Sequence, residues 1–288
     1  MSNSTSKNII KRKPLLMYFV FAFAFFWLFL ILTLVFLTTV LGLEMSAIPT
    51  WVFIASTIIG SWMPSLAAAV VTGVCEGSAA VGKLFGMFFK FRVPGRWYLA
   101  AIIPAVLTFA AVGIYRLFGG AASDGVNTAV NFWVLLFVSS IFTGATGEEP
   151  GWRGFALPRL LERHSPIKAG LRLGVIWGFW HLPLWLMESM PMPDLLIYIG
   201  AFMVYITSLT LLMTWIYMRT SHSLVPMVLA HFAPNFTLAL VVGGLGLAQE
   251  NPVFYLVAGL TLVTVLIVAA FGGLSRQKVV VEKLPETA

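Results

Sequence analysis

Long apolar stretches without a single charge constrain this chain more than any other feature of its sequence. The first runs through residues 14–43 and contains no Asp, Glu, Lys or Arg. A helix that crosses a bilayer needs about 20 apolar residues, whereas the apolar core of a signal peptide has only about 7–15. Charged residues make up 10% of the chain, against about 25% in a typical soluble domain, and the mean hydropathy is +0.93. The sequence therefore predicts an integral membrane protein.

The same apolar pattern recurs along the whole chain and predicts an all-α bundle of eight transmembrane helices. Short connections join the segments, so we expect a single membrane domain over residues 1–288. No convincing internal repeat is visible. The expected spans are residues 14–43, a stretch within 51–74, and then 97–117, 128–147, 173–187, 195–218, 224–245 and 253–274.

The basic residues predict how the bundle is oriented. With eight spans, every Lys and Arg except Arg116 falls at a terminus or in a connection on the same side of the membrane. By the positive-inside rule both termini are then cytoplasmic. No basic stripe of the kind that binds nucleic acid is present, so the expected surroundings are the lipid bilayer. Cys75 is the only cysteine, which excludes an intrachain disulfide.

Two adjacent carboxylates, Glu148 and Glu149, follow the fourth predicted span directly. Ending that span at Gly147 puts them at the cytoplasmic end of the helix. Glu149 and Arg153 are i,i+4 neighbours that can pair, which leaves Glu148 free. The alternative is an exposed ion pair that contributes little to stability. Pro150 lacks a backbone donor, so we expect a kink or a helix break at this point.

Two later apolar helices each carry one histidine, His181 and His231. His231 and Asn235 are one helical turn apart and share a face. His181 by itself can also be read as a buried histidine that makes one hydrogen bond and does nothing more. We expect Glu148, His181, His231 and Asn235 to meet in one polar cavity, open to the cytoplasmic side of the bundle.

Three kinds of chemistry fit such a group of side chains. A carboxylate can act as general base on water while His and Asn donors stabilise an oxyanion, which describes hydrolysis of an amide or ester. Glu148, His181 and His231 could instead bind zinc with one position open, although no His-Glu-x-x-His motif supports a metal site. Glu and His in membrane helices can also form a proton or ion pathway. The absence of visible repeats weighs against a transporter.

Three short motifs resemble those of the CAAX prenyl protease and bacteriocin-processing family of intramembrane proteases, also called the Abi family. They are Glu-Glu-x-x-x-Arg at 148–153, an aromatic-x-x-x-His at Trp177 to His181, and His-x-x-x-Asn at His231 to Asn235. The resemblance covers about residues 130–245. Trp177 stands where the family often has Phe, so the aromatic character is kept.

The resemblance implies an intramembrane endopeptidase with a conical cavity open to the cytoplasm. Glu148 and His181 would activate water, and His231 and Asn235 would form the oxyanion site. Glu149 completes the catalytic group, while Arg153 and Trp177 would be structural. No cofactor is expected, and zinc is the disfavoured alternative. The substrate would be a peptide or protein, prenylated or not, and the oligomeric state stays open. The competing hypothesis is a non-catalytic scaffold or bacteriocin-immunity protein with the same fold.

Overall fold

Helices account for all the regular secondary structure in the part of the chain that the computed structural model describes, residues 9–44, 47–122, 125–187 and 190–275. The α-helices of the first half are α2 (Pro14–Val35), α3 (Thr50–Ser61), α4 (Met63–Glu76), α5 (Ser78–Gly86), α6 (Gly95–Ala101) and α7 (Ile103–Leu117). Those of the second half are α8 (Val130–Ser140), α9 (Thr146–Glu149), α10 (Leu157–Arg163), α11 (Pro166–Trp180), α12 (Leu182–Trp185), α13 (Met192–Tyr217), α14 (Val225–Ala239) and α15 (Glu250–Ala270).

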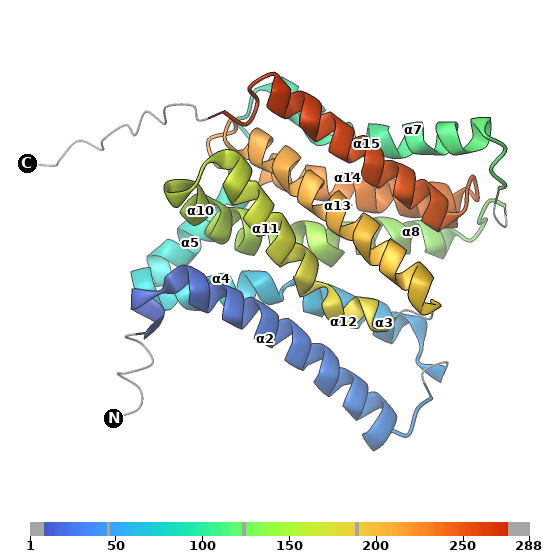
Figure 1. Ribbon diagram of the computed structural model, residues 1–288. Helices are drawn as coiled ribbons and strands as arrows, with labels where there is room; N and C mark the ends of the chain where they lie inside the picture. The colour runs from blue at the N-terminus through green and yellow to red at the C-terminus, as the bar shows by residue number, and fades with distance from the viewer. Residues whose placement is uncertain (1–8, 45–46, 123–124, 188–189, 276–288) are drawn as a thin grey trace, which may run out of the picture.

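Seven helical segments of the described residues are long and apolar enough to cross a membrane. Several combine two or more of the helices above. They are Pro14–Val40, Trp51–Glu76, Gly95–Leu117, Val130–Arg163, Met192–Tyr217, Val225–Gly244 and Glu250–Ala270. Together these segments form one helical bundle (Figure 1). The predicted all-α, multi-pass membrane fold is confirmed.

The fifth predicted span is shorter than the others. It corresponds to α11, which has 15 residues, followed at His181 by the four-residue α12. Pro183 cannot donate a backbone hydrogen bond, which explains why the long helix does not continue unchanged through this point. The two helices together lie among the long helices of the bundle (Figure 1). The count of eight transmembrane helices stays a prediction.

The fourth span is much longer than its sequence predicted. The span runs from Val130 to Arg163, a length of 34 residues, and so continues beyond Gly147. The expected helix end at the carboxylate pair is therefore wrong. Inside the span, Thr143 and Gly144 leave helical geometry, with φ/ψ of −88°/109° and 87°/−73°. Residues Pro150–Ala156 then form a π-helical segment, η5, as expected where Pro removes a backbone donor. Glu148 and Glu149 therefore lie in the interior of the bundle.

Close packing of α11 against α13 depends on three glycines spaced four residues apart, Gly170, Gly174 and Gly178. A methyl group added at Gly174 would lie 2.7 Å from the backbone Cα of Thr207 on α13. Small residues at this spacing let two membrane helices approach closely. This glycine series holds α11, and with it His181, against α13.

Replacing Gly174 with Ala should destabilise the protein by about 1–3 kcal/mol, the usual cost of overpacking. The backbone of α13 cannot move aside as a flexible side chain can. Gly200→Ala on α13 is the matched control, because a methyl group there meets no atom within 4 Å and Ala suits a helix interior better than Gly. Thermal unfolding in detergent measures both. Equal melting temperatures for the two variants would contradict this account of the α11–α13 contact.

Candidate active site

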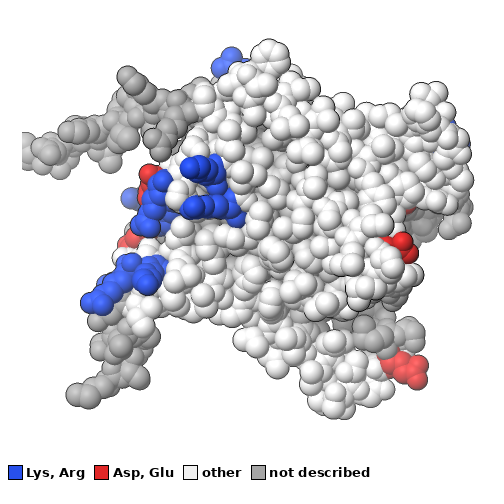
Figure 2. All heavy atoms as spheres, in the orientation of Figure 1, with Lys and Arg blue, Asp and Glu red and all other residues white. Residues whose placement is uncertain are grey.

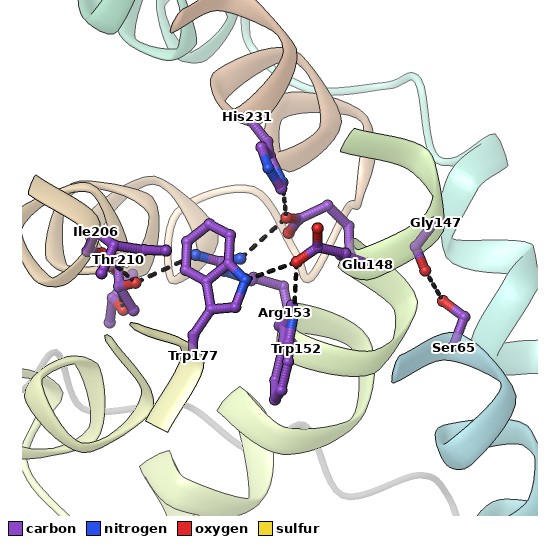
Figure 3. Close-up of polar contacts among 11 residues, drawn as sticks. Ser65, Gly147, Glu148, Trp152, Arg153, Trp177, Ile206, Thr210 and His231 are labelled. Carbon is purple, nitrogen blue, oxygen red and sulfur yellow. Dashed lines mark hydrogen bonds and ion pairs between the residues drawn. The ribbon is translucent and has the colours of Figure 1, made fainter. Parts of the chain in front are cut away.

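Glu148 is held in place by two tryptophans. Its Oε2 accepts hydrogen bonds from the indole Nε1 of Trp152 at 2.9 Å and of Trp177 at 2.6 Å (Figure 3). Indole groups can only donate, so this oxygen is fully committed as an acceptor. Glu148 is 4% exposed, and its second oxygen, Oε1, makes no hydrogen bond within the described residues. The two indoles thus fix the carboxylate and leave Oε1 available.

Glu149 lies at the centre of a separate, buried cluster of charges. Its Oε1 is 2.9 Å from Nη1 of Arg153 and 2.8 Å from Nδ1 of His231 (Figure 3). Glu149 and Arg153 are both 0% exposed. The guanidinium also lies over the Trp177 ring, 4.2 Å from its centroid, and donates to Thr210 Oγ1 at 3.4 Å. The predicted Glu149–Arg153 pair is present, and the contact with His231 gives Glu149 a further task.

The partners of the two histidines determine which ring nitrogen carries the proton. Nδ1 of His231 faces the Glu149 carboxylate, and Nδ1 of His181 lies 2.9 Å from the carbonyl oxygen of Trp177. A carboxylate and a carbonyl can only accept, so both Nδ1 atoms are donors. Each Nε2 is then left as a base in the neutral ring, or as a second donor in the charged ring. Neither Nε2 has a hydrogen-bond partner among the described residues.

The break in the fourth helix brings Gly144 between the two groups. Its φ of +87° is a conformation that glycine adopts without strain. A Cβ at this position would lie 2.8 Å from Nε2 of His231 and 3.2 Å from Oε1 of Glu148. The histidine nitrogen and the carboxylate oxygen therefore approach the same small space. Any side chain at position 144 would occupy it.

A cavity of about 280 Å³ adjoins this space, and all four predicted residues line it: Glu148, His181, His231 and Asn235. The prediction that they meet in one cavity therefore agrees with the structure, while their catalytic roles stay predictions. Asn235 has an exposed side chain and makes no hydrogen bond within the described residues. The remaining wall is mostly apolar and comes from the second half of α2, from α3, and from α12 and α13. It includes Leu30, Leu34, Leu37, Val52, Phe53, Leu184, Phe202 and Ile206.

The cavity lies away from the basic end of the bundle. Lys and Arg gather where α2 begins and where α10 and α11 meet (Figure 2). The cavity instead extends from Glu148 toward the end where α2 finishes and α3 starts. The sequence predicted both at the same, cytoplasmic end, and the structure separates them. The physical reason is the fourth helix, whose extension to Arg163 moves Glu148 roughly four turns from the basic end.

The donor set does not favour a metal ion. Among the described residues, no three His, Cys, Asp or Glu side chains lie close enough together to hold one. Glu148 Oε2 already accepts from two indoles, and both Nδ1 atoms already have partners. These partners orient the three side chains and leave Glu148 Oε1 and both histidine Nε2 atoms free within the described residues, so the absence of zinc stays a prediction.

Several residues of the site were not predicted. Trp152 is four residues after Glu148, the same spacing that predicted the Glu149–Arg153 pair, so its role had a readable signal. No sequence pattern indicated Gly144 or Thr210. The role of Gly144 depends on a break in the helix, and that of Thr210 depends on a contact between helices distant in the sequence. Sequence reasoning also missed the contact between Glu149 and His231, which are 82 residues apart.

Arg153→Met should lower the free energy of unfolding by about 3–5 kcal/mol, because it leaves the Glu149 carboxylate buried without its cation. The double variant Glu149→Gln, Arg153→Met removes both charges and should recover most of this loss. Denaturation of the purified variants in detergent measures the difference. If the single and double variants were equally unstable, packing of the Arg153 side chain, and not charge, would account for the loss.

The part of the chain that matches known proteins includes the candidate active site. Residues 129–237 match the family model described as type II CAAX prenyl endopeptidase Rce1-like. CAAX prenyl protease 2 of Methanococcus maripaludis is 29% identical over 143 residues, which cover 46% of this chain and 52% of that protein. The chain thus matches about half the length of this curated relative. The resemblance that the three motifs predicted is confirmed: residues 129–237, which contain all three motifs, are similar to the Rce1-like CAAX prenyl endopeptidase family.

Proposed function

We propose that this protein is an intramembrane endopeptidase in which Glu148 activates water. The observation that carries the proposal is the state of the Glu148 carboxylate. One oxygen is fixed by two indole donors, and the other is left beside the cavity that His181 and His231 also line. A general base must be oriented and must have a free lone pair within reach of water. The family match over residues 129–237 supports the same function.

The first chemical step is addition of water to the peptide carbonyl. Glu148 Oε1 takes one proton from water while the oxygen forms a bond to the carbonyl carbon. His181 assists through Nε2, since its Nδ1 is held by the Trp177 carbonyl. The carbonyl double bond becomes a single bond, and the oxygen acquires negative charge. Side chains that can donate to this oxygen are Asn235, through its amide, and His231, through Nε2 when its ring is charged.

Collapse of the tetrahedral intermediate completes the reaction. The proton held by Glu148 passes to the amide nitrogen, the C–N bond breaks, and the carbonyl reforms. The products are a carboxylic acid and an amine, and Glu148 returns to its ionised form. During these steps Glu149 balances positive charge on His231 through the 2.8 Å contact with Nδ1. Oriented donors of this kind stabilise a developing oxyanion because they need no reorganisation.

The cavity walls favour an apolar substrate segment. No Lys or Arg is found among the described residues that line it. A charged side chain, or a free carboxylate at the cleavage site, would thus lack a cation to compensate its loss of hydration. The substrate is a peptide or protein with an apolar segment near the scissile bond. The name of the relative, CAAX prenyl protease 2, makes prenylated peptides one class to test, since an isoprenoid chain also suits apolar walls.

Glu148→Gln should reduce turnover by about 10²–10⁴-fold, because Gln keeps the shape and the acceptor oxygen but cannot take a proton. Asn235→Ala should cost about 10²–10³-fold through loss of one oxyanion donor. Cleavage of prenylated and unprenylated peptide libraries by the purified protein measures both. The melting temperature of each variant, taken on the same preparation, separates loss of chemistry from loss of folding.

A non-catalytic scaffold gives a different result in this experiment. In that case wild-type protein cleaves no peptide, Glu148→Gln keeps full biological function in cells, and only variants that unfold lose it. Glu149→Gln and Arg153→Met are the variants expected to unfold. Full cellular function of Glu148→Gln would therefore overturn the catalytic assignment.

We further propose that hydrolysis needs no metal ion. The purified protein should contain no stoichiometric zinc, and incubation with EDTA or phenanthroline should leave turnover unchanged. The support is geometric, because no three His, Cys, Asp or Glu side chains among the described residues lie close enough together to hold a metal ion. Loss of activity on chelation, with recovery on adding zinc, would assign Glu148, His181 and His231 as ligands instead.

The orientation proposed from the basic residues places both termini in the cytoplasm. Reporter fusions at positions 90 and 165 should then report the cytoplasm, and fusions at 120 and 248 the opposite side. With this orientation the cavity extends from the middle of the membrane toward the non-cytoplasmic side. The reverse signals at 90 and 165 would instead place its opening toward the cytoplasm.

A further inference from the structure

A second hollow lies at the basic end of the bundle, far from the candidate active site. It is a groove of about 560 Å³ between the first turn of α2, the end of α10 and the middle of α11. Its apolar wall consists of Leu15, Leu160, Leu171, Val175 and Ile176, and its polar rim consists of Arg163, His164 and Arg172. Both Leu171 and Val175 are about two-fifths exposed, at 42% and 40%. The groove therefore joins an accessible apolar strip to a cationic rim.

The cations at this rim, and Lys168 beside it, have no ion-pair partner among the described residues. None of Arg163, Lys168 and Arg172 forms an ion pair with a carboxylate within the described ranges of the chain, whereas neighbouring Arg159 pairs with Glu76 at 2.6 Å. Nη1 of Arg172 instead contacts Nε2 of His164. Partial burial and the charges of Arg172, Lys168 and Arg163 all lower the pKa of the His164 imidazole. Several positive charges thus lie near one another here without an ion-pair partner in the described part of the chain.

The position of the groove along the span matches the shape of a lipid. Arg163 is the last residue of the 34-residue apolar segment Val130–Arg163, so we expect its guanidinium near the headgroups, where charged residues at the ends of spans commonly lie. On α11, Val175 and Ile176 lie one turn further into the bundle than Leu171 and Arg172. A molecule bound here would have its charged group on the arginines and its apolar part along the membrane-facing strip. Figure 2 shows the basic side chains grouped at this end of the protein.

We propose that this groove is a binding site for an anionic phospholipid, whose phosphate is held by Arg163 and Arg172 and whose acyl chain follows Leu171, Val175 and Ile176. Arginine suits the phosphate because its planar fork can donate two parallel hydrogen bonds. Basic pockets between membrane helices at the cytoplasmic side commonly bind anionic headgroups. An acidic peptide would satisfy the arginines but would leave the apolar strip uncovered.

The test uses the full-length protein in phosphatidylcholine nanodiscs and in detergent, titrated with phosphatidylglycerol. Native mass spectrometry of the detergent complex gives lipid retention, and the melting temperature gives stabilisation. Wild-type protein should retain phosphatidylglycerol in preference to phosphatidylcholine. Arg163→Gln with Arg172→Gln should weaken this binding about 30-fold. Lys90→Gln with Arg92→Gln, which removes two charges at the same end outside the groove, should keep it.

A variant that fills the groove tests the apolar part of the proposal separately. Val175→Trp should reduce phosphatidylglycerol retention while leaving the rim arginines in place. Inorganic phosphate alone should stabilise the wild type far less than the lipid does. The proposal is overturned if both double variants lose the lipid equally, if phosphatidylcholine binds as well as phosphatidylglycerol, or if phosphate alone gives the full stabilisation.

Discussion

The buried carboxylate of Glu149 is the interaction on which the rest of the site depends. It is 0% exposed and accepts from both Arg153 and His231, so one charge connects the fourth span with α14. Through Arg153 the same cluster reaches Thr210 on α13 and the face of Trp177 on α11. Buried charges persist only when paired with good geometry. This pairing places His231 and Trp177 around Glu148, and it gives the two neighbouring glutamates different tasks.

Local backbone irregularity is what lets one helix present both carboxylates. Thr143 and Gly144 leave helical geometry, and the segment Pro150–Ala156 is π-helical. Such departures are tolerated at membrane depth where the freed groups face protein or a cavity. Hydroxyls from α3 and α4 support the region, since Ser61 donates to the Phe142 carbonyl and Ser65 to that of Gly147.

Features that depend on residues close together in the sequence were predicted correctly. Uncharged runs predicted the membrane helices, and i,i+4 spacing predicted the Glu149–Arg153 pair and the shared face of His231 and Asn235. The prediction failed where charge was used to place a helix end. Glu148 and Glu149 lie inside the span because one oxygen of each is hydrogen-bonded, that of Glu148 by Trp152 and Trp177 and that of Glu149 by Arg153 and His231. Those contacts join separate helices, and no spacing rule predicts them. The separation of the cavity from the basic end of the bundle was missed for the same reason, while the side of the membrane on which the cavity opens stays a prediction.

The bundle separates three environments along its length. Within the described residues, Arg163 and Arg172 lie without an ion-pair partner at the end where α10 meets α11. The buried Glu149–Arg153 pair lies in the middle, and an apolar cavity lined by no Lys or Arg occupies the other half. Hydrolysis inside a membrane requires a charged base beside an apolar substrate, two demands that conflict because isolated charges are costly there. In the proposed mechanism both demands are met, because one Glu148 oxygen accepts from two indole donors and the other lies at the cavity. A fully paired carboxylate would be stable but inert, and an unpaired one would be too costly to bury.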